Sequence, residues 1–350
     1  MTAIKFGIIG FGIFGEKRLI PGFQGSRGMI EAITKRNIEE AKQKSAQYDI
    51  PLYFDDPEAM LNDASLDAVY IASPNKNHLE HVKIAAEHGK DVICEKPMAT
   101  TIDDAIEMSR ICNKQGVRFM IAHCYRFMGS CLKIKEIINS GELGDVEFIT
   151  THYSFPAGSS PRTWVFNKEL AGGGPIFDIG VHMVDVIRFL LQDHELLAFK
   201  GYSRPFDMDK YPERDVEAFG SLLMQFSDGV QASITCSFDM PYLTEITVHG
   251  TKKTLNSRYF TIVEKDADII IYTDADFKNP EQNFTVNNGN FYRNMIDAFI
   301  EAGETGSQVN SIPGLKDGIL NQIVLNRWND GSSKDLIDSL IEKACVPSSE

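Results

Sequence analysis

Three glycines near the start of the chain have the spacing of a loop that binds phosphate groups. They lie in Gly10-Phe11-Gly12-Ile13-Phe14-Gly15, directly after an apolar run and before a segment that favours a helix. In such a loop the first glycine makes a tight turn, the second lets the backbone approach a pyrophosphate, and the third packs helix on strand. A glycine turn without a ligand is the alternative, and the spacing to the next apolar run favours a dinucleotide.

That next apolar run ends in basic residues where a carboxylate is usual. Thr34, Lys35 and Arg36 lie about 20 residues beyond Gly15, where an Asp or Glu commonly binds the 2′-hydroxyl of a ribose. Lys35 and Arg36 would instead pair with a 2′-phosphate, and Thr34 would donate a hydrogen bond to it. We therefore expect NADP as the cofactor, with NAD as the second choice. A solvated basic pair at the surface is the alternative.

A lysine that follows another buried run has the position of a catalytic group. Glu95-Lys96-Pro97 comes directly after Asp91-Cys94 and would lie at the carboxyl edge of a parallel sheet, where ligands bind. A lysine there can hydrogen-bond a substrate hydroxyl and stabilise the alkoxide that forms during hydride transfer, and the proline fixes the turn. A Glu-Lys ion pair at the surface is the alternative.

The preceding apolar run ends at the same edge. Its polar residues are expected to line the nicotinamide-ribose side of the cofactor and are Ser73, Pro74, Asn75 and His78. We also count Glu95 and Lys96, which follow the neighbouring run, among the cofactor-binding residues. For His78 a plain role as a polar residue at the start of a helix is an equal alternative.

A third group of polar residues falls within an apolar segment. With Pro175 in the first turn of a helix, Asp178, His182 and Asp185 are at positions i, i+4 and i+7 and share one helix face. A histidine beside a carboxylate is suited to act as a general base. A zinc site is the rival interpretation, but the segment has no cysteine and no second histidine, so we expect no metal. For Asp185 we expect a structural role as a buried acceptor.

The composition excludes several classes of partner. The chain has 350 residues and a formal net charge of -14, which argues against nucleic acids and anionic membranes, because binding to these depends on clustered Lys and Arg. The six cysteines form no CxxC pair, so we expect free thiols and a cytoplasmic location. The sequence has no run of 18 apolar residues, and we expect no membrane span.

The elements that must position these residues form two domains. Up to residue 124, short apolar runs alternate with amphipathic segments, which predicts a doubly wound parallel sheet, the Rossmann fold. The runs are Lys5-Ile9, Ile30-Thr34, Ala68-Ala72, Asp91-Cys94 and Arg118-Ala122. We therefore assign residues 1–124 to a dinucleotide-binding domain within an α/β protein.

Beyond residue 124 the pattern changes to alternating stretches separated by turn signals. These stretches predict strands of an open, mainly antiparallel sheet and include Val146-His152, Ala218-Phe226, Val230-Phe238, Leu243-Gly250 and Ile269-Tyr272. Helices are expected at Cys131-Ser140, Phe291-Glu301 and Leu315-Asn329. We assign residues 125–350 to an α+β domain for substrate binding and oligomerisation.

Together, these motifs resemble the Gfo/Idh/MocA family of oxidoreductases. The resemblance covers nearly the whole chain and rests on GFGIFG, ASPNKNHLEHVKIAAEHGKDVICEKP, Tyr125-Arg126-Phe127 and GGGPIFDIGVHMVD, in that order. It implies an enzyme that acts on CH-OH groups, a small carbohydrate or polyol as substrate, and a homodimer or homotetramer assembled through the open sheet.

The resemblance also assigns roles to single residues. It implies that Lys96 is the catalytic lysine and that Asp178 and His182 are the acid and base on the substrate side, with His182 as proton acceptor. It places further substrate contacts at Tyr125, Arg126, Arg162 and Trp164. Lys35 and Arg36 depart from the acidic residue of the NAD-dependent members.

The mechanism expected from these residues is reversible hydride transfer between a secondary alcohol and the nicotinamide, in a cleft between the two domains. Two alternatives remain. One is a glycosidase-type enzyme that oxidises its sugar transiently with a tightly held NAD. The other is a protein that senses NADP or a sugar without turnover, although a sensor has no need of a proton relay.

Overall fold

The computed structural model describes residues 3–262, 265–273, 280–305 and 312–345, and the chain divides into two compact units. The first unit contains the chain up to Cys124, Asn290–Gln322 and the residues from Ile341; the second contains Tyr125–Gly289 and Ile323–Leu340. The break after Cys124 coincides with the predicted boundary. The prediction of one continuous domain over 125–350 is corrected, because two later segments belong to the first unit.

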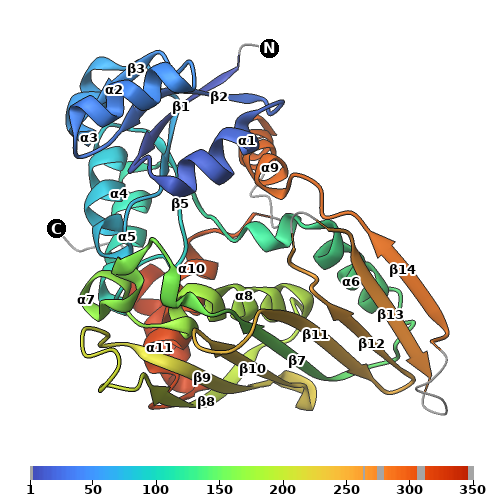
Figure 1. The fold of residues 1–350 in the computed structure, drawn as a ribbon. Helices are drawn as coiled ribbons and strands as arrows, with labels where there is room; N and C mark the ends of the chain where they lie inside the picture. Colours follow the sequence, from blue (N-terminus) through green and yellow to red (C-terminus); the bar gives the residue numbers. More distant parts are fainter. Residues whose placement is uncertain (1–2, 263–264, 274–279, 306–311, 346–350) are drawn as a thin grey trace. The chain divides into compact units, whose positions relative to one another are not determined.

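An amphipathic helix accounts for the return of the chain to the first unit. Helix α9 (Phe291–Thr305) is amphipathic, and it buries its apolar face in the first unit, where the rings of Phe299 and Phe6 lie 6.2 Å apart. Figure 1 shows α9 beside α1 (Ile20–Phe23). Amphipathicity predicts the helix but does not tell which sheet it covers.

The first unit is built on a six-stranded parallel sheet with the order β3-β2-β1-β4-β5-β6, as predicted for a Rossmann fold. Its strands are β1 (Ile4–Ile9), β2 (Gly28–Thr34), β3 (Leu52–Phe54), β4 (Ala68–Ile71), β5 (Asp91–Cys94) and β6 (Phe119–Ile121). Its helices include α2 (Ile38–Gln47), α3 (Pro57–Asp63), α4 (His78–Glu87), α5 (Ile102–Gln115) and part of α10 (Leu315–Arg327). The sequence did not predict β3, which has three residues.

The helix that follows the glycine loop starts with a wide turn. Residues Gly15–Leu19 form the π-helix η1, and α1 (Ile20–Phe23) continues it. Pro21 has no N–H to donate to a carbonyl of the preceding turn, which accounts for the loss of regular α-helical hydrogen bonding here. The helix nevertheless begins where the sequence predicts.

The second unit contains a nine-stranded sheet of described residues, with the order β14-β13-β12-β11-β7-β10-β9-β8-β15. All of its neighbouring strands run antiparallel except β7 and β10, so the predicted architecture is confirmed. The strands are β7 (Val146–Ser154), β8 (Leu196–Pro205), β9 (Glu217–Phe226), β10 (Gln231–Ser237), β11 (Leu243–Gly250), β12 (Lys253–Arg258), β13 (Ala267–Thr273), β14 (Gln282–Val286) and β15 (Ser332–Ser333).

Helices cover one face of this second sheet. They are α6 (Gly129–Asn139) and α8 (Val181–Leu190), and α8 packs against β7 and β10 (Figure 1). The unit also holds the short helix α7 (Lys168–Ala171) and most of α11 (Lys334–Cys345). Alternate residues of β9 are buried, which is the pattern expected when one face of a sheet carries the core.

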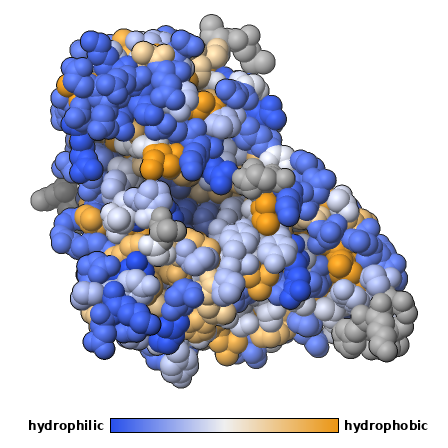
Figure 2. All heavy atoms as spheres, in the orientation of Figure 1, coloured by the Kyte–Doolittle hydropathy of each residue, from blue (hydrophilic) through white to orange (hydrophobic). Residues whose placement is uncertain are grey.

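One apolar stretch of this unit has the length and composition of a membrane span. It runs from Lys168 to Leu190, and 89% of its most apolar window is buried inside the structure. Such burial is typical of the core helix of a folded domain. The face drawn in Figure 2 is mainly hydrophilic, with hydrophobic residues scattered over it.

Candidate active site

The glycine loop of the first unit closes against the segment that follows β4. Gly10 has a φ of +86°, and a Cβ added to it would lie 2.8 Å from the backbone nitrogen of Ser73, so the position requires glycine. At Gly12 the nearest atom to an added Cβ is a carbonyl oxygen at 4.0 Å, which leaves that backbone open to a ligand. An added Cβ at Gly15 would meet the ring of Phe11 at 2.7 Å.

These distances confirm the predicted tight turn at Gly10 and refine the role of Gly15, which packs on Phe11 rather than directly on a strand. The open backbone at Gly12 fits the pyrophosphate of a dinucleotide. Of the two remaining loop residues, Ile13 is 47% exposed, and the ring of Phe14 contacts that of Tyr292 at 5.7 Å.

Thr34 holds the glycine loop in place. Its hydroxyl oxygen accepts a hydrogen bond from the N–H of Gly10 at 3.1 Å, and its carbonyl oxygen accepts one from the N–H of Phe11 at 2.9 Å. The residue is buried, with 3% of its surface exposed. Thr34 therefore shapes the loop from inside, and its burial argues against the predicted contact with a 2′-phosphate.

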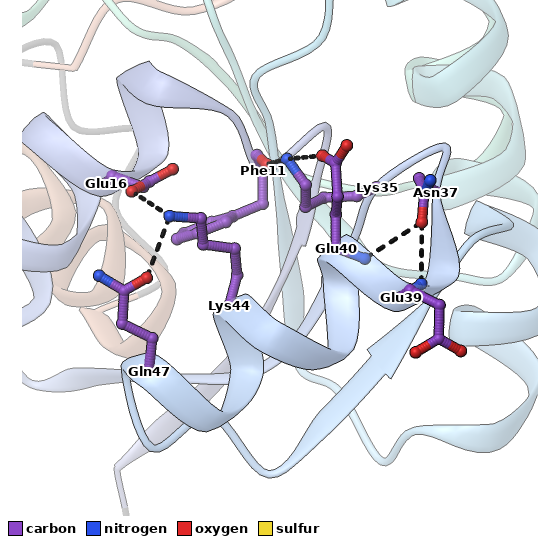
Figure 3. Close-up of polar contacts among 8 residues, drawn as sticks. All are labelled: Phe11, Glu16, Lys35, Asn37, Glu39, Glu40, Lys44 and Gln47. Carbon is purple, nitrogen blue, oxygen red and sulfur yellow. Dashed lines mark hydrogen bonds and ion pairs between the residues drawn. The ribbon is translucent and has the colours of Figure 1, made fainter.

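The two basic residues after β2 differ in their surroundings. The Lys35 ammonium donates to the carbonyl oxygen of Phe11 at 3.2 Å and pairs with Glu40 at 3.2 Å (Figure 3). Arg36 is exposed, and its side chain has no hydrogen bond or ion pair with any described residue. Of the two, Arg36 has a guanidinium that a 2′-phosphate can engage without breaking an existing contact.

An ion cluster beside the glycine loop was not predicted from the sequence. Glu16 accepts from the Lys44 ammonium at 2.7 Å and from the Tyr48 hydroxyl at 3.0 Å. Figure 3 shows Lys44 reaching from α2 towards Glu16. Burial pushes the pKa of Glu16 up, but hydrogen bonds from Lys44 and Tyr48 outweigh it and lower the pKa. The cluster ties α2 to the helix that follows the loop.

The end of β4 places polar residues at the carboxyl edge, but His78 faces inwards. His78 is fully buried; its Nε2 lies 3.0 Å from the carbonyl oxygen of Ser73, and its Nδ1 lies 3.1 Å from that of Pro97. Burial lowers its pKa to about 4, so the imidazole is neutral. His78 is the first residue of α4 and links two loops, so the helix-start interpretation fits and a contact with the nicotinamide ribose does not.

The remaining residues of this edge are also largely enclosed. Ser73 and Asn75 are 8% and 6% exposed, and Pro74 precedes the short helix η2 (Asn75–Asn77). The Ser73 hydroxyl lies 2.9 Å from Nδ1 of His81, a histidine that the sequence did not single out. The contact of the Ser73 to Asn75 segment with a cofactor stays a prediction.

In the lysine motif after β5, the glutamate is held by hydrogen bonds. Glu95 is 9% exposed; its carboxylate accepts from the Tyr70 hydroxyl at 2.6 Å and from the N–H of Lys96 at 3.3 Å. Tyr70 is fully buried, and burial raises its pKa well above the usual value. The alternative of a Glu-Lys pair at the surface is therefore wrong for Glu95. The side chain of Lys96 is half-buried.

In the second unit, Asp178 has a cation as its partner. Both oxygens of its carboxylate accept from Arg162, at 3.2 Å from Nη1 and 2.8 Å from Nη2. The side chain of Arg162 is 37% exposed and that of Asp178 is 10% exposed. A bidentate guanidinium fixes the plane of the carboxylate. Arg162 and Asp178, predicted from separate motifs, thus lie together.

The helix that carries Asp178 does not begin as a regular α-helix. Pro175 occupies its first turn as predicted, but Ile176–Gly180 form the π-helix η6 before α8. The prediction of regular α-helical spacing from Asp178 to Asp185 is therefore corrected. Wide turns of this kind often occur at functional sites.

Glu217 anchors the start of this helix. Its carboxylate accepts from the N–H groups of Gly174 at 2.9 Å and Ile176 at 3.3 Å. A Cβ added to Gly174 would lie 2.2 Å from the carbonyl oxygen of Glu217, so the turn requires glycine. Burial raises the pKa of Glu217 although these N–H groups act in the opposite direction. This carboxylate was not predicted from the sequence.

His182 stacks on Tyr125. The two ring centroids lie 4.2 Å apart with an interplanar angle of 16°, and His182 is 8% exposed. A side-chain hydrogen bond joins Tyr125 to Tyr153 at the end of β7, and burial raises the pKa of Tyr153. Tyr153 also lies near the charges of Asp178 and Arg162. The sequence does not single out Tyr153, because this residue falls within an ordinary strand pattern.

Asp185 has the structural role expected for it. It is 1% exposed and accepts from Arg126, with Nε at 2.8 Å and Nη2 at 2.6 Å. The Arg126 guanidinium also lies over the ring of Phe189 at 5.6 Å. Arg126 is 7% exposed, so the ion pair with Asp185 holds its side chain inside the second unit. The contact of Arg126 with a substrate stays a prediction.

Breaking this buried pair should destabilise the second unit. Asp185→Ala leaves the buried Arg126 charge without its carboxylate, and we expect the free energy of unfolding to fall by about 3–5 kcal/mol. Urea unfolding followed by circular dichroism measures this loss. The control is Asp239→Ala, which breaks the exposed pair with Arg204 and should cost about 1 kcal/mol or less. Equal losses in both variants would contradict the prediction.

The last predicted substrate residue, Trp164, lies in the short helix η5 (Thr163–Phe166) and is half-buried. Among the described residues, no hydrogen bond or ring contact joins Trp164 to Asp178 or His182, and its role stays a prediction. Within the ranges covered by the structure, no three His, Cys, Asp or Glu residues are grouped so as to hold a metal ion.

Comparison with known proteins assigns both parts of the chain. The sequence profile described as "Oxidoreductase family, NAD-binding Rossmann fold" matches residues 4–123, and that of the GFO/IDH/MocA C-terminal domain matches residues 131–256. D-xylose 1-dehydrogenase (NADP(+)) 2 of Haloferax volcanii is 31% identical over 305 residues, which cover 87% of this chain and 90% of that protein.

Two further proteins are similar to this chain over most of its length. 1,5-Anhydro-D-fructose reductase of Ensifer adhaerens is 26% identical, over 87% of this chain and 89% of that protein. The structure of levoglucosan dehydrogenase in complex with NADH has the same fold, with a TM-score of 0.80 and 20% identity over 98% of this chain and 97% of the other. The chain is an oxidoreductase that acts on CH-OH groups, and it belongs to the Gfo/Idh/MocA family.

Proposed function

We propose that this protein catalyses the reversible oxidation of a secondary alcohol on a sugar, an inositol or a related polyol, with NADP preferred over NAD. The observation that carries the proposal is the set Lys96, Asp178 and His182 within this oxidoreductase family. The relatives named above are a xylose dehydrogenase, an anhydrofructose reductase and a levoglucosan dehydrogenase, which supports a carbohydrate substrate.

The first unit holds the dinucleotide in this proposal. The open backbone at Gly12 and the turn at Gly10 take the pyrophosphate, and the residues after β2 take the adenosine ribose. When bound there, a nicotinamide would supply reversible hydride exchange with the alcohol carbon. Lys96, held at the sheet edge by its own backbone bond to Glu95, hydrogen-bonds the reacting oxygen and stabilises negative charge on it.

The second unit supplies the proton chemistry. As the alcohol carbon loses its hydride, its O–H proton passes to a ring nitrogen of His182, and the carbonyl product forms. The stacked ring of Tyr125 fixes the plane of the imidazole. Asp178 positions the hydroxyl or the imidazole, and Arg162 keeps that carboxylate in one orientation.

The cofactor preference is assigned to Arg36. A charge-assisted hydrogen bond to a 2′-phosphate changes affinity by about 10–100-fold, so we expect the protein to bind NADPH at least tenfold more tightly than NADH. Arg36→Ala should remove most of this difference and leave NADH binding unchanged. Fluorescence titration of the reduced cofactors measures both constants.

The matched control is Lys42→Ala, which removes an exposed cation from α2 and should change neither constant. Equal affinities for NADPH and NADH in the unaltered protein, or tighter binding of NADH, would contradict the preference for NADP. The named relatives leave the choice open, because one carries NADP in its name and another is a complex with NADH.

A screen tests the reaction itself. Aldoses, polyols and inositols are offered with NADP and with NAD, and keto-sugars with the reduced cofactors, and the absorbance of the reduced nicotinamide is followed. We expect net reduction with at least one alcohol and net oxidation with the matching ketone. A cofactor that co-purifies and never changes its redox state would point to transient oxidation during glycoside cleavage instead. The homo-oligomer and the cytoplasmic location stay predictions.

A further inference from the structure

A buried arginine of the second unit is held between aromatic rings. Arg214 is 7% exposed, and its guanidinium carbon lies 4.0 Å from the ring centroid of Tyr211, 4.1 Å from that of Phe166 and 4.8 Å from that of Phe206. Phe166 and Phe206 also contact each other edge to face at 5.9 Å. Contacts with ring faces fix the plane of a guanidinium without using its N–H donors.

The guanidinium N–H groups of Arg214 have few acceptors among the described residues. Its Nε lies 3.4 Å from a carboxylate oxygen of Glu213, whose side chain is 67% exposed. That nitrogen is buried without a hydrogen bond, and no described residue accepts a hydrogen bond from the rest of the guanidinium. Buried polar groups are normally satisfied, so a fixed guanidinium whose N–H donors lack acceptors among the described residues is available to a ligand.

Arg214 lines a hollow of about 600 Å³ that lies within the second unit. Lys168 adds a second cation to the lining. Two of the lining carboxylates already have backbone partners: Asp215 accepts from the N–H of Lys168 at 2.6 Å, and Glu217 accepts from that of Gly174 at 2.9 Å. Lys168 and Arg214 are the cations of the lining, which also contains Ser203, Asn326, Asn329 and the exposed Asp330.

We infer that this hollow binds a small oxyanion, a carboxylate or a phosphate group, on the fork of Arg214. The planar guanidinium matches two oxygens of either group, and its aromatic cage holds it ready for them. Neither Asp178 nor His182 lines the hollow, so the site is separate from the candidate active site. One wall includes Phe177, the residue before Asp178.

Titration with inorganic phosphate and with acetate tests this inference. Each anion is added to the full-length protein in the presence of saturating NADPH, which occupies the phosphate sites of the first unit, and calorimetry measures binding. We expect one saturable site for at least one of the two probes. Binding of phosphate alone identifies a phosphate ligand, and binding of acetate identifies a carboxylate.

Variants then place the site. Arg214→Met should weaken anion binding about tenfold or more, because a charge-assisted bidentate contact is lost. Lys168→Glu reverses the charge at the rim without touching the aromatic cage and should weaken it several-fold, which keeps the test decisive if the Arg214 variant does not fold. The control Arg204→Met removes an exposed, ion-paired arginine and should change nothing. No saturable binding of either probe, or binding that Lys168→Glu leaves unaltered, overturns the inference.

Discussion

Lys96→Ala is expected to lower kcat for alcohol oxidation by about 10²–10³-fold. The ammonium is the group we assign to the developing negative charge on the reacting oxygen, and loss of one such donor removes stabilisation that exists mainly in the transition state. The affinity for NADPH should change little, because the glycine loop and Arg36 hold the cofactor in our account. Steady-state turnover and a cofactor titration on the same preparation measure both effects.

The control for this variant is Lys83→Ala, which removes an exposed lysine from α4 and should keep full activity. Lys96→Arg provides a second comparison, because it keeps the charge but changes its shape and reach. Near-complete turnover in Lys96→Ala would remove the lysine from the mechanism. A parallel loss of NADPH affinity would show instead that Lys96 serves cofactor binding.

His182→Ala should lower kcat by about 10²–10⁴-fold, because the alcohol proton then has no positioned acceptor. A neutral imidazole accepts a proton and an imidazolium donates one, so in the unaltered enzyme the rates of oxidation and reduction should respond to pH in opposite directions. In the variant this pH dependence should flatten. Turnover measured in both directions across pH tests this.

His88→Ala, which alters a histidine at the end of α4, is the control and should keep the full pH profile. A profile that survives in His182→Ala would mean that another group takes the proton. Tyr153 would then be the first residue to test, because it hydrogen-bonds Tyr125, on whose ring His182 stacks.

The sequence predicts the frame of the first unit well, because its signals are local. Uniform apolar runs such as Phe6 to Ile9 mark strands buried on both faces, and Gly10 marks the turn that follows. Strand β3 has three residues, two of them half-buried and one exposed. A pattern of this length is too short to indicate a strand. Helix α9 was predicted, but its docking on the first unit depends on contacts with residues nearly 300 positions away.

The partners of the polar residues were harder to predict. A buried acceptor role was expected for Asp185, but Arg126 lies 59 positions away and nothing local links the two. His78 carried a functional interpretation because polar residues at a sheet edge often bind ligands; its full burial, with a carbonyl oxygen near each ring nitrogen, is visible only in the fold. Arg36 differs from Lys35 for the same reason, since only the structure shows that Lys35 already has partners.

The central claim is that hydride and proton leave the same alcohol, with Lys96 and His182 acting on its oxygen. A single-turnover experiment with a substrate found in the screen, deuterated at the reacting carbon, tests it most directly. We predict one reduced cofactor and one carbonyl product for each active site, a slower step with the deuterated substrate, and loss of that step in Lys96→Ala and His182→Ala. A product without reduced cofactor, or a step that both variants carry out at the normal rate, would contradict the account.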